Sequence, residues 1–269
     1  IVKFNLDGKI YLDLPSKITN VKSLVIEIKF LCIPLTFFNK LNEVFNENFI
    51  TISEIYCSSY VKSTSYIKFF ENFNLKIFLD IGYKKSSTIV FYKNKLVFYN
   101  TTPVGGNHIT KDLSILLKID ESTSEKIKKS FNKSEFTFSN NDLNENKQIK
   151  NKLVKNISTD MLRKVIYARV DEIIKLSLEN INFENFIEED GESILIFTGE
   201  GSKILNRNSI YLDNKFNIFK EMNFFEDESK NVCESAREFI EKNKYLEVNF
   251  VPKIPKKRGF FEKLFYIFN

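Results

Sequence analysis

The sequence has no tryptophan, a single histidine and only three cysteines among its 269 residues. Cys32, Cys57 and Cys233 lie far apart and show no CxxC spacing, which argues against both a disulfide framework and a Cys/His zinc site. Long apolar runs are also missing, because Glu27 and Lys29 interrupt the best candidate before it reaches the ~18 residues that a membrane-spanning helix needs. The sequence therefore predicts no spanning helix.

A strong charge of one sign is absent as well. Lysine and arginine number 40 and aspartate and glutamate 35, so the net charge is only +5, which excludes a dedicated polyanion binder. Hydrophobic residues make up 43% of the chain and charged residues 28%, which leaves enough apolar surface for the core of one large or two modest domains. We expect a globular chain.

Short strands and a helix alternate in the first part of the chain. We expect strands at 2–5, 24–31 and 50–57, and an amphipathic helix over 34–49 with Pro34 in its first turn. The apolar residues of that helix recur at spacings of three and four, at Leu35, Phe38, Leu41, Val44, Phe45 and Phe49. Helices packed on a sheet, an arrangement of the α/β class, are the predicted fold.

Two apolar strands farther along end in turns of small residues. The run 75–79 stops at Asp80-Ile81-Gly82, and the run 193–197 stops at Thr198-Gly199-Glu200-Gly201-Ser202. Backbone N–H groups in such turns can approach phosphate oxygens, and a carboxylate at a strand end can hold a metal-bound water. One such turn alone is more often only a turn, but two of them about one small domain apart indicate a phosphate site.

The remaining elements follow from local signals. We expect strands at 89–92 and 96–99 joined by a Lys93-Asn94-Lys95 turn, a helix opening at Thr110, and a helix over 125–131 with a capping box from Ser122 to Glu125. We then expect a polar hairpin or loop at 132–155 and a long helix at 158–180. An acidic connection follows at 182–190, and a last helix at 229–243.

Four motifs in these segments carry a resemblance to a known family. They are Asp80-Ile81-Gly82 through Ser86, Pro103-Val104-Gly105-Gly106 leading into Ile109-Thr110-x-Asp112, the helix Ala168-Arg169-Val170-Asp171-Glu172-Ile173, and Thr198-Gly199-x-Gly201-Ser202. With them the chain resembles FtsA, the actin-like bacterial cell-division protein, over nearly its whole length. The segments 7–15 and 24–31 also resemble the end of the subdomain that distinguishes FtsA from actin.

The resemblance implies two lobes of the actin/Hsp70 type, which are ribonuclease H-like, with one lobe incomplete and with ATP and Mg²⁺ between them. The first phosphate motif would precede Ile1, where we expect an N-terminal truncation because neither Met nor a signal-peptide pattern is present. The remainder of the first lobe, including the end of the FtsA-specific subdomain, is expected at 1–72. The nucleotide-binding second lobe is expected at 73–120 and 186–250, with its further subdomain at 121–185. A linker and membrane-targeting helix are expected at 251–269.

The resemblance also assigns roles to individual residues. Asp80 would hold Mg²⁺ through a water, and Gly82 and Ser86 would face phosphates. Other residues expected at the nucleotide are Gly105 and Gly106 in the strand-to-helix turn, Arg169 and Glu172 on the helix beside the adenosine, and Gly199, Gly201 and Ser202 on the adenosine side. Two places depart from the family pattern, since Tyr83-Lys84-Lys85 and Glu200 replace small residues, so we expect at most a weak ATPase.

Three polar residues have alternative interpretations. Arg169 lies within the apolar stripe of its helix, so its guanidinium must face either a ligand or an internal partner such as Glu172 at i+3. For His108 we favour a polar residue near a helix start over a catalytic role, because no nucleophile accompanies it. Asp112 is expected to cap or flank its helix.

The C-terminal tail carries the second strong signal. A basic stretch precedes Gly259, and apolar residues then follow a one-sided helical pattern, which is typical of a helix lying in an anionic membrane surface. A docked C-terminal helix is the alternative, and no platform for nucleic acid accompanies the basic residues. The residues expected at the membrane are Lys256, Lys257, Arg258, Phe260, Phe261, Leu264, Phe265 and Phe268.

The function predicted by the resemblance is a peripheral protein on the cytoplasmic side of the bacterial cell membrane. It would self-associate into filaments at the division site, the septum, and tether FtsZ filaments there through the FtsZ C-terminal tail. Two alternatives stay open: another actin-like scaffold of pilus assembly or cell shape, and a kinase or chaperone-type ATPase. The second would need a catalytic carboxylate in a substrate pocket, which no segment presents.

Overall fold

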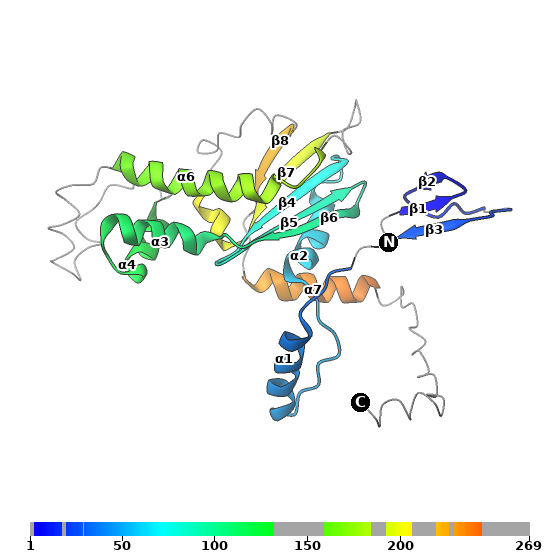
Figure 1. The fold of residues 1–269 in the computed structure, drawn as a ribbon, viewed down its shortest axis with the longest axis horizontal. Helices are drawn as coiled ribbons and strands as arrows, with labels where there is room; N and C mark the ends of the chain where they lie inside the picture. Colours follow the sequence, from blue (N-terminus) through cyan, green and yellow to red (C-terminus); the bar gives the residue numbers. More distant parts are fainter. Residues whose placement is uncertain are drawn as a thin grey trace, which may run out of the picture.

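The computed structural model describes residues 3–17, 20–28, 30–131, 159–183, 192–205, 219–225 and 229–243. Its main body is a five-stranded sheet with the strand order β6-β5-β4-β7-β8 (Figure 1). Strands β4, β5 and β6 form an antiparallel meander, whereas β7 pairs in parallel with β4, and β8 with β7. Their bounds are β4 Leu75–Ile81, β5 Ser86–Tyr92, β6 Lys95–Thr102, β7 Ser193–Thr198 and β8 Glu221–Phe224.

Strand β4 lies at the centre of this sheet, and all seven of its residues are buried because helices cover both faces. Ile77 and Leu79 point into a core shared with α3 and α6, whereas Phe78 packs on the other face with Tyr66 and Phe70, at the ends of α2 and η1. Helix α7 packs against α2. The bounds of these helices are α2 Ser58–Tyr66, η1 Ile67–Phe69, α3 Gly106–Leu117, α6 Thr159–Leu178 and α7 Ser229–Asn243.

Helix α4 (Glu121–Ser130) follows α3 and packs against it. Its N-cap is Asp120, whose carboxylate accepts a hydrogen bond from the backbone N–H of Thr123 at 2.9 Å. Hydrogen bonds from Ser122 and Thr123 lower the pKa of Asp120. The expected capping box starting at Ser122 is therefore wrong, because the better acceptor two residues earlier begins the helix.

The N-terminal part forms a separate three-stranded antiparallel sheet of order β2-β1-β3, with bounds β1 Lys3–Leu6, β2 Lys9–Tyr11 and β3 Leu24–Glu27. Asp7 and Gly8 join β1 to β2 with left-handed backbone angles, as a two-residue hairpin turn requires. An ion pair between Asp13 and Lys95 links this part to β6. Helix α1 (Leu35–Glu47) projects from the body and buries none of its residues (Figure 1).

Several expected elements are confirmed, one expected strand does not form, and one helix begins earlier than expected. The strands of the β4–β6 meander, the Lys93-Asn94 turn with two left-handed residues, and α7 lie where the sequence predicts them. No strand forms at 50–57; Ile50 and Ile55 are exposed there, and α2 begins at Ser58. That expectation came from the local sequence alone, and neither sheet of the described residues includes this segment. Helix α3 begins at Gly106 rather than at Thr110.

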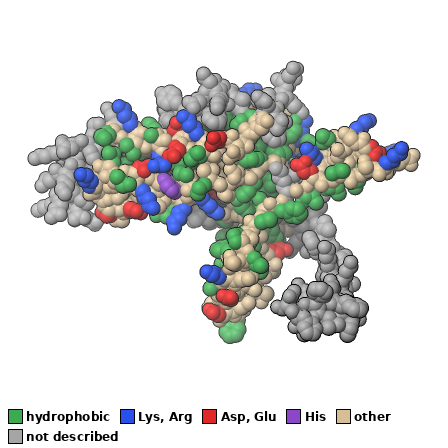
Figure 2. All heavy atoms as spheres, viewed as in Figure 1, with side chains coloured by type: hydrophobic (Ala, Val, Ile, Leu, Met, Phe, Trp, Pro, Cys, Tyr) green, Lys and Arg blue, Asp and Glu red, His purple; other side chains and the backbone are tan. Residues whose placement is uncertain are grey.

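The surface agrees with the small net charge. Figure 2 shows Lys/Arg and Asp/Glu side chains interspersed over the end of the molecule formed by α3, α4 and α6, with no expanse of one sign on this face. None of the helices in the described ranges combines the length and the apolar run needed to cross a bilayer. The expected loop at 132–155, most of the acidic connection at 182–190 and the membrane tail lie outside the described residues.

Candidate functional site

The two glycine-bearing turns meet at one end of the sheet. Because β4 and β7 are parallel neighbours with Asp80 opposite Thr198, the turns that follow them leave the sheet side by side. A Cβ placed on Gly201 would lie 3.2 Å from the carbonyl oxygen of Gly82, and one on Gly106 would lie 3.5 Å from Cα of Gly201. We call this group the glycine cluster; its members are Gly82, Gly105, Gly106, Gly199 and Gly201.

Close backbone packing explains most of these glycines. A Cβ on Gly105 would lie 2.5 Å from the carbonyl oxygen of Gly82, and one on Gly201 would lie 2.8 Å from that of Ile81. Gly199 has a φ of 86°, and a Cβ there would lie 2.6 Å from the carbonyl oxygen of Ile81. These three positions must be glycine for the turns to pack at all.

Gly106 differs from the other members. A Cβ there would meet Gly201, the Nζ of Lys128 and Gly82 only at 3.5 to 3.7 Å, which is ordinary van der Waals contact. No contact within the protein therefore requires glycine at the start of α3, and its lack of a side chain leaves room at the centre of the cluster. Gly106 is thus the member of the cluster whose glycine is not explained by the packing of the turns.

The N–H groups at the start of α3 are already used within the protein. The N–H groups of Gly106, Asn107 and His108 donate to the carbonyl oxygens of Gly82, Tyr83 and Gly105. His108 also accepts a hydrogen bond at Nδ1 from the N–H of Gly105 at 3.2 Å, which confirms it as a polar residue of the helix start. The N-terminus of α3 is thus hydrogen-bonded mainly to the turn after β4, and these three N–H groups are already paired.

Both predicted serines shape the backbone of the site. The Ser86 hydroxyl donates to the carbonyl oxygen of Val104 at 2.7 Å, and the Ser202 hydroxyl donates to that of Gly199 at 2.7 Å. Both side chains are buried. Their contacts with a nucleotide stay a prediction, since in this structure each hydroxyl hydrogen is directed at a main-chain acceptor.

Arg169 of α6 makes internal ion pairs. Its Nε and Nη2 donate to the two carboxylate oxygens of Asp112 at 2.6 and 2.9 Å, and Nη1 pairs with Glu172. The hydrogen bonds that the guanidinium donates to Asp112 raise the pKa of Arg169. The alternative of an internal partner for Arg169 is therefore confirmed, with Asp112 as the main partner. The expectation that Asp112 caps its helix is wrong, because it connects the middle of α3 to α6.

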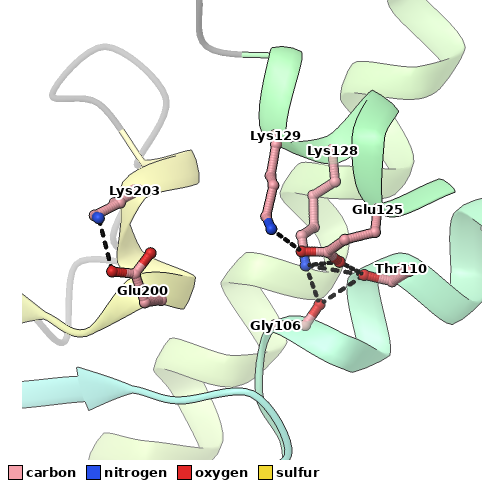
Figure 3. Close-up of polar contacts among 7 residues, drawn as sticks. All are labelled: Gly106, Thr110, Glu125, Lys128, Lys129, Glu200 and Lys203. Carbon is pink, nitrogen blue, oxygen red and sulfur yellow. Dashed lines mark hydrogen bonds and ion pairs between the residues drawn. The ribbon is translucent and has the colours of Figure 1, made fainter. Parts of the chain in front are cut away.

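A buried lysine that the sequence reasoning missed lies beside Gly106. Lys128 of α4 donates from Nζ to the carbonyl oxygen of Gly106 at 3.0 Å and to the hydroxyl of Thr110 at 2.9 Å, and it pairs with Glu125 (Figure 3). Burial alone would raise the pKa of Glu125, but hydrogen bonds from Lys128 and Thr110 outweigh it and lower the pKa. The sequence feature that could have revealed this buried lysine is its position next to Ile127, on the face of α4 that is buried.

A second charged pair stands opposite, on η3 (Glu200–Ile204). Glu200 accepts a hydrogen bond from Lys203 at 2.7 Å, and both side chains are largely exposed. Figure 3 shows this pair on one side and the side chains of Glu125 and Lys128 on the other. Charged side chains of both signs thus lie on the two sides of the view in Figure 3.

Asp80 does not fit the expected magnesium role. It is only 9% exposed, and its Oδ1 lies 3.2 Å from Nζ of Lys62, a residue of α2 that is 6% exposed. Within the described ranges, no three His, Cys, Asp or Glu side chains gather, so these residues form no all-protein metal cage. Mg²⁺ at a nucleotide needs only one or two carboxylates beside the phosphates, so Lys62 is the observation that counts against the expected role. The carboxylate therefore already has a cation beside it.

The comparisons with known proteins agree with this architecture. MreB5 of Spiroplasma citri, in a structure bound to ADP, is 19% identical with a TM-score of 0.56, and the match covers 80% of this chain and 68% of that chain. The same protein bound to AMPPNP is 20% identical with a TM-score of 0.54, over 80% and 67% of the two chains. No curated protein matches the chain by sequence.

The structure thus has the actin-like α/β fold, and its partial coverage of the MreB chains fits one incomplete lobe. The model of the family described as cell division protein FtsA matches residues 77–251, which is well over half of the chain. The chain belongs to the FtsA family. The expected family and fold class are therefore confirmed.

Proposed function

We propose that this chain binds an adenine nucleotide at the glycine cluster and acts as a self-associating adaptor protein in bacterial cell division. The observation that carries the first half is Gly106, where the protein itself has no steric need for glycine. A phosphate or ribose there would contact backbone and the buried ammonium of Lys128. Membership of the FtsA family and the actin-like fold support the same assignment.

The second half of the proposal concerns assembly and location. Copies of the chain associate into filaments, bind the C-terminal tail of FtsZ and hold it on the inner face of the cytoplasmic membrane at the septum. The membrane contact is made by the basic and apolar tail residues, from Lys256 to Phe268. Each Phe or Leu contributes at most about 1.5–3 kcal/mol and each cation about 1, before the cost of ordering the helix. One tail binds weakly, and a filament of many tails binds strongly.

A substitution at Gly106 tests nucleotide binding. Gly106→Ala adds a methyl group that the fold accepts but that narrows the space beside Gly201, so the chain should stay folded while its affinity for ADP falls by about tenfold or more. Ile115→Ala, on the exposed side of the same helix, is the matched control and should bind ADP as the wild type does. Isothermal calorimetry gives both affinities. Unchanged binding by Gly106→Ala would refute the site.

Vesicle sedimentation tests the membrane contact. The full chain should sediment with vesicles that contain anionic lipid, and a chain lacking 260–269 should stay in the supernatant. Vesicles without anionic lipid provide the control for the basic residues. Equal sedimentation of the two chains would remove the tail from the proposal and leave the nucleotide site untouched.

A further inference from the structure

The Lys62–Asp80 ion pair is the most deeply buried charge pair next to the glycine cluster. Asp80 is the penultimate residue of β4, and its Oδ1 is also the atom nearest to a Cβ placed on Gly199. Lys62 reaches it from α2 on the neighbouring layer, with Nζ at 3.2 Å. The pair therefore lies directly beneath the turns at which the nucleotide is proposed to bind.

Two further described groups near Asp80 bring no positive charge. Ser87 of β5 is neutral, and so is Tyr99 of β6, because burial and then its hydrogen bond with Cys57 raise its pKa to about 12, with the charge of Asp80 adding to the rise. A buried carboxylate is stable only with a countercharge or several hydrogen bonds. Lys62 supplies that countercharge from within the protein.

A divalent cation at the same carboxylate would lie within a few ångströms of the Lys62 ammonium. The two positive charges would repel each other at close range, and the carboxylate would have to be shared between them. Further ammonium groups stand around the cluster: Lys84 and Lys85 in the exposed turn after Gly82, and Lys128 beside Gly106. Together they can neutralise phosphate charge without a metal.

We propose that the Lys62 ammonium takes the place of the divalent cation at Asp80, so that nucleotide binding at the glycine cluster does not depend on Mg²⁺. This inference rests on the proposed nucleotide function and deepens it. It also replaces the expectation that Asp80 holds Mg²⁺ through a water. The nucleotide is held by fixed ammonium groups, and its affinity is the same whether or not a metal accompanies it.

Calorimetric titration of the full chain with ADP, in excess Mg²⁺ and in EDTA, tests the inference. The wild type should give the same dissociation constant in both buffers. Lys62→Met removes the ammonium and leaves the carboxylate available to a metal, so its affinity should be weaker in EDTA than in Mg²⁺ by about tenfold or more. Lys76→Met is the matched control: Lys76 is equally buried at the opposite end of β4, where it bonds to Asn94, and this variant should bind as the wild type does.

Each outcome is decisive. A wild-type affinity that falls by about tenfold or more in EDTA would overturn the inference while leaving the nucleotide site in place. Equal affinities for Lys62→Met in the two buffers would also overturn it, because Lys62 would then not be the group that replaces the metal. No binding of ADP in either buffer would overturn the proposed function, and this inference with it. If Lys62→Met does not fold, as its circular dichroism would reveal, the wild-type comparison decides alone.

Discussion

The ion pair between Arg169 and Asp112 connects α6 to α3 and lends itself to a double-mutant cycle. Arg169→Met keeps most of the aliphatic stem and Asp112→Asn keeps the shape of the side chain, so each change removes charge with little change in packing. The four proteins of the cycle are the wild type, the two single variants and the double variant. Their free energies of unfolding give the coupling energy between the two side chains.

The geometry sets the expected size of that coupling. The two hydrogen bonds are parallel and short, at 2.6 and 2.9 Å, and a hydrogen bond to a charged group contributes about 1.5–3 kcal/mol net. Both side chains are about a quarter exposed to solvent, and Glu172 stays available to Arg169 when Asp112 is changed. Screening and the second partner reduce the value, so we expect a coupling of about 1–2 kcal/mol.

Urea denaturation followed by circular dichroism provides the measurement, with all four proteins in one buffer. A coupling below about 0.5 kcal/mol, which is the usual scatter of additive mutations, would show that the pair does not form in solution. In that case the guanidinium would be available to the nucleotide, as the family resemblance implies. Binding of ADP to Arg169→Met then decides between the two roles.

Two further predictions concern the core of the site and of the sheet. The folded-state pKa of Glu125 is lowered, so its contribution to stability is present above about pH 4.5 and is lost as the pH falls through the lowered value. Glu125→Gln should therefore make the free energy of unfolding depend less on pH between about pH 6 and pH 3, as measured by urea unfolding. An equal dependence on pH in the variant and the wild type would contradict this. Phe197 is fully buried and stacked on Phe224, so Phe197→Ala should lower the free energy of unfolding by about 3–5 kcal/mol, with a loss under about 1 kcal/mol as the contrary result.

The sheet could be predicted from the sequence because its signals are local. The runs at β4 and β7 are short, apolar and bounded by small residues, and the Lys93-Asn94 turn takes left-handed angles that asparagine tolerates. The pairing of β4 with β7 was not predicted, because a parallel ladder joins strands that lie far apart in the sequence. It decides where the site lies, since it brings Gly82 beside Gly201.

Helix α2 and the buried lysines could not be predicted in the same way. Only two of the five buried residues of α2 are apolar or aromatic, so the apolar repeat that indicates a helix is incomplete; the five are Ser59, Val61, Lys62, Ser63 and Tyr66. A lysine in a sequence is ordinarily expected to be exposed to solvent. Lys62 is buried because it pairs with Asp80 of β4, and Lys128 is buried because it pairs with Glu125 of its own helix. The Lys62–Asp80 pair depends on tertiary geometry, whereas the Lys128–Glu125 pair is local and only its burial depends on the packing of α4 against α3.

The parallel ladder between β4 and β7 has a consequence for the order in which the protein assembles. The β4–β6 meander joins neighbours in sequence and can form early, whereas Leu75 finds Ser193 only after the long intervening chain has closed into a loop. Gly199 and Gly201, two of the five members of the glycine cluster, arrive with that late partner. A ligand that contacts glycines from both sides of this pairing would therefore bind only molecules in which β7 has paired with β4. Its binding would stabilise that pairing against local unfolding.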